Sequence, residues 1–131
     1  MALGYSVTLR NNMLDEITAL AGTNAKLLIY NGTRPATGGT ATTLLAQLTC
    51  DATAFAAAAS SGALTLNAIV QDSSADASGT ASWFRITSSA DVHVLDGDVG
   101  TSGSDLNLTT TLITATQPVS ITSFVITEGN P

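Results

Sequence analysis

The sequence predicts a mainly β domain, an antiparallel β-sandwich or barrel-like fold with one amphipathic helix at its N-terminal end. Segments of alternating apolar and polar residues recur about every ten residues beyond residue 25, with turn-forming residues between them. Only the first part of the chain has the apolar spacing of a helix. Because 131 residues suffice for one core, we expect a single domain over 1–131, with the helix at about 9–21 and a β-rich region at 25–127.

The helix is predicted by apolar residues that recur at spacings of three and four. These positions are Leu9, Met13, Leu14, Ile17, Leu20 and Ala21. Gly22 follows them and is a natural C-terminal cap. We expect the apolar stripe to pack on the domain's own sheet, with docking on a partner as the alternative.

The first half of the β region should hold two strands and two loops. Residues 25–30 (AKLLIY) and 43–50 (TLLAQLTC) have strand character. Between them, 31–39 (NGTRPATGG) combines turn dipeptides with a proline and should form a loop. Residues 51–62 have helical propensity but end quickly in glycine, so we expect a loose turn or packed loop anchored by Phe55.

The second half should be strands alone, joined by polar turns. The expected strands are 63–70, 80–87, 91–96, 105–113 and 118–127. In the last of them the apolar residues change from one face to the other, which indicates a β-bulge or a strand that is covered on both faces.

Alternation along 80–87 assigns side chains to opposite faces of the sheet. Phe84 and Ile86 share one face, whereas Trp83 and Arg85 share the other, where Arg85 could stack on Trp83 or pair with an acid. The core is expected to contain Leu28 or Ile29, Leu64, Leu66, Val70, Phe84, Ile86, Leu106, Leu108 and Ile121, with Met13 and Ile17 covering one edge.

The chain is poor in charge. Charged residues make up 11%, against about 25% in an ordinary soluble domain. Four basic and ten acidic residues give a net charge of −6, so we expect neither nucleic-acid binding nor attraction to an anionic membrane. A surface of threonine, serine and alanine is typical of a protein that is largely covered by partners, or of a virion or extracellular β-protein.

The sequence contains few features that indicate a cellular compartment. Cys50 is the only cysteine and is expected to be a buried apolar filler, which leaves no intramolecular disulfide. The sequence starts without a basic and then apolar segment, so we expect no signal peptide. No apolar run approaches the roughly 20 residues of a membrane span. We therefore expect production in the cytoplasm of the producing cell, for use there or for assembly into a particle.

The stretch DGDVGTSGSDLNL, residues 96–108, is the main candidate for chemistry. A calcium loop that begins at Asp96 needs glycine at its sixth position and glutamate at its twelfth. Thr101 and Asn107 stand there instead, so the rule fails twice. A looser cation site formed by Asp96, Asp98 and Asp105 remains the alternative, but we expect no metal and no cofactor.

The same stretch contains a serine between glycines. The Gly-x-Ser-x-Gly pattern around Ser102 fails because its fifth position is Ser104. His93 is the only histidine and lies in a predicted strand, so a His93–Ser102–aspartate constellation has little support. We expect no catalytic site, and we interpret 96–105 as a long hairpin connection with its carboxylates solvated at the tip.

Three stretches in combination resemble a known group of proteins. They are LRNNMLDEITALAG (9–22), LLIYNGTRPATGGTATTLLAQL (27–48) and the pair ASGTASWFRITSS and VLDGDVGTSGSDLNL (77–89 and 94–108). The combination resembles a family of small structural proteins of tailed bacteriophages. None of these motifs encodes chemistry, and the resemblance brings no catalytic residues.

The resemblance implies a non-enzymatic virion protein, assembled in the host cytoplasm. The first expectation is a capsid decoration (cement) protein, bound in many copies to the outside of the head. Its partners would be other copies of itself, as a dimer or trimer, and the major capsid protein or another virion protein. The alternatives are a neck, tail or fibre-associated component and, from a different class, a glycan-binding or hydrolytic module.

Overall fold

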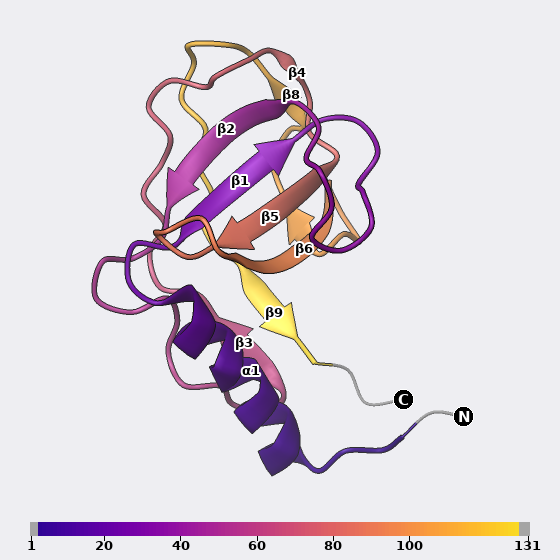
Figure 1. Cartoon of the computed structure of the whole chain (residues 1–131), viewed down its shortest axis with the longest axis vertical. Helices are drawn as coiled ribbons and strands as arrows, with labels where there is room; N and C mark the ends of the chain where they lie inside the picture. Colours follow the sequence, from indigo (N-terminus) through magenta and orange to yellow (C-terminus); the bar gives the residue numbers. More distant parts are fainter. Residues whose placement is uncertain (1–2, 129–131) are drawn as a thin grey trace.

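The computed structural model describes residues 3–128 and confirms the mainly β fold class with one N-terminal helix. The elements are α1 (Val7–Ala21), β1 (Lys26–Tyr30), β2 (Leu44–Thr49), β3 (Ala63–Thr65), β4 (Gly79–Thr80), β5 (Trp83–Thr87), β6 (His93–Gly100), β7 (Leu106–Asn107), β8 (Leu112–Ile113) and β9 (Val125–Thr127). The largest sheet curls into a half-barrel, and α1 lies at one end of it beside β3 and β9 (Figure 1). None of the described helical residues forms a segment long and apolar enough to cross a membrane.

Helix α1 starts two residues before the expected boundary because Ser6 caps it. The Ser6 hydroxyl oxygen accepts a hydrogen bond from the Leu9 amide at 3.1 Å. At the other end Gly22 has a φ of 69° and donates its amide to the Thr18 carbonyl at 3.1 Å. The C-terminal boundary is therefore the predicted one.

The main sheet has the strand order β2-β1-β5-β6-β7. Its first three pairs are antiparallel, as expected, whereas β6 and β7 are parallel. That pair matches only Val99 with Leu106 and Gly100 with Asn107, and residues 101–105 join the two strands without the long crossover that parallel strands usually need. Two small antiparallel sheets, β3-β9 and β4-β8, complete the described part of the fold.

The two faces of the sheet are covered differently. Phe84 and Ile86 lie in the main core with α1 and the small sheets, as alternation predicts. Trp83 lies on the other face in a second cluster with Leu28 and Tyr30. This outer cluster is covered by the connection between β1 and β2, since Trp83 Nε1 donates to the Asn31 carbonyl.

Most of the expected core is buried, with two corrections. Leu64, Leu66, Phe84, Ile86, Leu106, Leu108 and Ile121 are buried, as are both Leu28 and Ile29. Val70 is instead 61% exposed, because β3 ends at Thr65 and only an isolated bridge to Thr49 engages Val70. Met13 is exposed as well, and Ile17 is half-buried. Phe55 and Cys50 are buried as predicted.

Several expected strands are shorter than their sequence patterns. The segment 63–70 keeps three strand residues because the side chain and main chain of Asn67 bond to the carbonyls of Ala54 and Phe55. The segment 105–113 is divided between β7 and β8, and 118–127 forms a strand only at Val125–Thr127. Alternation indicates extended backbone, but a strand also needs a neighbour with which to pair.

Candidate functional site

The stretch 96–108 is half strand and half turn, so the predicted hairpin connection is wrong. Strand β6 continues through Gly100, and the turn 101–105 then leads into β7 beside it. Gly103 takes a φ of 69° in this turn, a conformation that glycine adopts without strain. The first half of the stretch is thereby built into the sheet.

The three carboxylates of this stretch have three different partners. Asp96 contacts Arg85, Asp98 lies 3.4 Å from Arg34, and Asp105 accepts the Asp98 amide at 2.9 Å. The last two are exposed, whereas the Asp96 side chain is 3% exposed, which corrects the expected solvation of all three. Among residues 3–128, no group of three metal-ligating side chains is close enough to hold an ion.

His93 and Ser102 do not form a catalytic pair in the described chain. His93 Nε2 lies 3.2 Å from Asp96 Oδ1, but the contact is poorly directed, and this shielded nitrogen makes no hydrogen bond of acceptable geometry. Ser102 is exposed in the turn, and no hydrogen bond within residues 3–128 joins it to His93. The arrangement lacks the hydrogen bond from nucleophile to base that acyl transfer requires.

Asp96 is the centre of the most developed polar cluster. Arg85 donates to both oxygens of Asp96, through Nε at 2.7 Å and a terminal nitrogen at 3.0 Å, and the Gly38 amide adds a bond of 3.0 Å. Burial by itself raises the pKa of Asp96, but the bonds from Arg85 and Gly38 outweigh it and hold the pKa below its usual range. Asp96 in turn raises the pKa of Arg85, so both partners stay charged.

Aromatic contacts extend this cluster across the outer face of the sheet. Arg85 lies 5.3 Å above the ring of Trp83, and Tyr30 stacks on that ring with centroids 4.3 Å apart. Both options anticipated for Arg85 are therefore realised together. Arg85 also donates to the Gly39 carbonyl at 2.9 Å, which fastens the connection between β1 and β2 to the sheet. The hydrogen bonds of Arg85 and Asp96 thus join β5 and β6 to the connection between β1 and β2.

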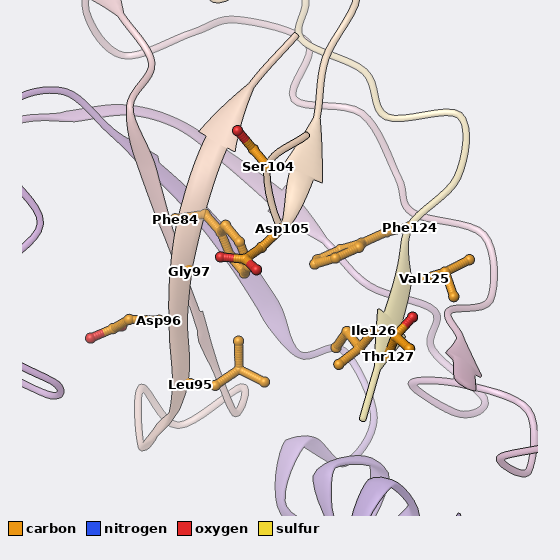
Figure 2. A pocket seen from close by; sticks show the side chains of 10 residues that line it. All are labelled: Phe84, Leu95, Asp96, Gly97, Ser104, Asp105, Phe124, Val125, Ile126 and Thr127. Carbon is orange, nitrogen blue, oxygen red and sulfur yellow. The ribbon is translucent and has the colours of Figure 1, made fainter. Parts of the chain in front are cut away.

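A cavity of about 380 Å³ lies between β6 and β9. Its lining residues are Phe84, Leu95, Asp96, Gly97, Ser104, Asp105, Phe124, Val125, Ile126 and Thr127 (Figure 2). Phe84 and Phe124 meet there edge to face, with centroids 5.3 Å apart. The sequence pattern does not predict this cavity, because it gives no information on which strands lie across from one another in the fold.

The second candidate is an apolar surface on α1, here called the α1 stripe, made of Leu9, Met13 and Leu20. Residues spaced by four and seven positions lie on one side of a helix. Their exposed fractions are 44%, 37% and 64%. Leu14 and Ala21 on the neighbouring side are buried in the core. The helix thus divides its apolar residues between the core and the solvent, so the expected packing on the domain's own fold is confirmed for Leu14 and Ala21 and is wrong for the α1 stripe.

Comparison with models of known protein families, with curated proteins and with solved structures finds no match to this chain. The features of this chain that bear on function are therefore its fold, the cavity and the α1 stripe.

Proposed function

We propose that this chain is a non-enzymatic structural protein of a tailed phage particle, a capsid decoration protein bound in many copies to the outside of the head. The observation that carries the proposal is the α1 stripe. Exposed apolar side chains grouped on one element mark sites of protein association. Val7, the first residue of the same helix, and Leu3, which precedes the helix, are also exposed and apolar.

The composition supports an assembly role. Soluble domains that act alone usually carry more surface charge than the 11% of this chain. Symmetric association would cover the α1 stripe and allow each assembly to contact several capsid subunits. The net charge of −6 suits a position outside the shell, away from the packaged DNA.

The polar cluster supports a structural rather than an enzymatic role. Arg85 and Asp96 neutralise each other, and their remaining hydrogen bonds go to Gly38 and Gly39. These bonds stabilise the fold and offer no free base or nucleophile to a substrate.

The decisive experiment counts copies in purified particles. Quantitative mass spectrometry of gradient-purified phage that encodes this chain should give an amount comparable to that of the capsid subunit, and antibodies should label the head. A few copies at the tail vertex would favour the neck or tail alternative. Absence from purified particles would refute the proposal.

The α1 stripe is tested in solution. The wild-type protein should sediment as a dimer or trimer, and Leu20→Glu should shift it toward monomer because a buried unpaired charge opposes association. Leu112→Glu is the matched control, since Leu112 is also exposed but lies in β8. If both variants sediment like the wild type, the α1 stripe is not the contact surface.

A further inference from the structure

The cavity between β6 and β9 is walled by main chain on the side of β6. The Asp96 side chain points away from the cavity toward the outer face of the sheet, and Gly97 has no side chain (Figure 2). The cavity therefore meets backbone atoms of Asp96 and Gly97. On the opposite side, the side chain of Val125 also points away from the cavity.

The strand pairing shows which backbone groups of β6 are directed away from β5. Val99 donates its amide to the Ser82 carbonyl, so in this antiparallel pair Leu95, Gly97 and Val99 turn their polar groups toward β5. Asp96 and Asp98 consequently turn theirs to the other edge.

That other edge of β6 is only partly occupied by the described chain. Gly100 accepts the Leu108 amide at 2.8 Å, and the Asp98 amide is bonded to Asp105. Asp96 is the next residue along the edge, and the pairing with β7 does not reach it. Its amide and carbonyl are thus directed to the cavity side without a neighbouring strand in residues 3–128.

Strand β9 also directs alternate backbone groups away from its neighbour β3. Phe124 accepts the Leu66 amide, and Glu128 donates to the Gly62 carbonyl, so alternate residues of β9 turn toward β3. Val125 and Thr127 therefore turn their backbone groups away from β3, and both line the cavity. Within the described chain, β3 is the only strand beside β9.

We propose that this cavity binds an extended peptide segment of a partner protein, which adds a short strand along β6 or β9. Strand addition satisfies open backbone donors and acceptors, and alternate side chains of the segment supply specificity. Leu95 and Ile126 are only half-buried and offer an apolar surface for side chains of that segment, next to the buried rings of Phe84 and Phe124. The inference goes beyond the proposed particle role and stands on different residues.

The charge of the residues that line the cavity indicates which kind of peptide segment it would bind. Asp105 is an exposed carboxylate at the cavity, and no lysine or arginine is among the lining residues. A segment with one basic side chain among apolar ones is therefore favoured over an acidic one. The acidic end of β9 in a second copy fits less well, since Glu128 follows Thr127 there.

The test supplies the segment at high local concentration. A Thr-Val-Lys-Val-Thr segment is fused behind the full chain through a Gly/Ser linker of about ten residues, which makes binding intramolecular. Amide hydrogen exchange of Asp96, Val125 and Thr127 is followed by NMR, with Ile29 as the reference for global stability. Exchange at Asp96, or at Val125 and Thr127, should slow by about tenfold or more while that of Ile29 stays constant.

Two matched controls separate strand addition from other effects. A Pro-Pro-Lys-Pro-Pro fusion keeps the charge but retains only the lysine amide, so it cannot form a strand ladder and should give no slowing. Asp105→Asn keeps an oxygen for the Asp98 amide but removes the charge, so it should weaken the effect of the lysine segment. Asp76→Asn, an exposed carboxylate outside the cavity, should not.

Two results would overturn the proposal. One is the same exchange rate at all three amides in every fusion. The other is amide exchange in the unfused protein that becomes slower as the protein concentration rises. Such a result would mean that a second copy of the chain occupies this edge. Neither result changes the copy number in particles, so the particle role is tested separately.

Discussion

Replacing Asp96 with asparagine should destabilise the protein by about 3 kcal/mol at neutral pH. The Asp96 and Arg85 side chains are 3% and 12% exposed, so the substitution leaves a nearly buried guanidinium without its counter-charge. Breaking such a pair costs about 3–5 kcal/mol, and we take the lower end because a single connection between β1 and β2 covers the pair. In a domain of this size the loss corresponds to roughly 10 °C in melting temperature.

The assay is urea denaturation followed by tryptophan fluorescence. Trp83 is the only tryptophan and lies in the same cluster, so its emission reports on the loss of this structure. Asp76→Asn is the control and should stay within about 0.5 kcal/mol of the wild type, because Asp76 is exposed. Adding Arg85→Met to Asp96→Asn should recover part of the loss, since no uncompensated charge remains.

The pH dependence gives an independent check. The folded pKa of Asp96 is lowered, so the unfolded chain takes up the proton first, near its ordinary value of about 3.9. The stabilisation from the ionised carboxylate is thus complete above that pH and is lost as the pH falls through the folded pKa. A difference between variant and wild type that is below about 1 kcal/mol at pH 7, or that stays constant down to about pH 3, would refute this account.

Four further predictions concern other parts of the fold. Phe84→Ala should cost roughly 3–5 kcal/mol in urea denaturation because the ring is fully buried, and a loss below about 1 kcal/mol would contradict its place in the core. Gly97→Ala should cost about 1–3 kcal/mol, since its Cβ would lie 2.5 Å from the Phe84 ring, and this cost should shrink in a Phe84→Leu background. Cys50 should resist thiol reagents at neutral pH until the protein is unfolded, because burial raises its pKa to about 11; rapid labelling of the native protein would count against this. The melting temperature should be equal with calcium and with chelator, whereas a bound ion at 100 times its dissociation constant would add about 2.7 kcal/mol of stability.

Local pattern determined a substantial part of this structure. The spacing of apolar residues predicted α1, and Gly22 predicted its C-terminal end. Alternation placed Phe84 in the main core and Trp83 on the opposite face, and both are buried there. These properties depend on backbone geometry within one element, with a period of 3.6 or 2, and a sequence records that period directly.

The sequence predicts only part of the candidate functional site. The incomplete motifs around Ser102 indicate no nucleophile, but the same pattern predicts solvated carboxylates at 96–105, and Asp96 is buried. The sequence offers ten acidic residues, and nothing in their order selects Asp96 as the partner of Arg85. That choice depends on the register of β5 against β6, which places the two residues opposite each other.

Only the tertiary structure decided how much of each pattern is used. The α1 stripe and the buried side of α1 look alike in sequence, yet the surrounding fold covers one and leaves the other in solvent. The segment 63–70 alternates throughout, yet only Ala63–Thr65 finds a partner in β9. The cavity between β6 and β9 likewise exists because segments distant in sequence meet there. Burial and strand pairing each depend on two surfaces in contact. The sequence of a single segment specifies only one of those two surfaces.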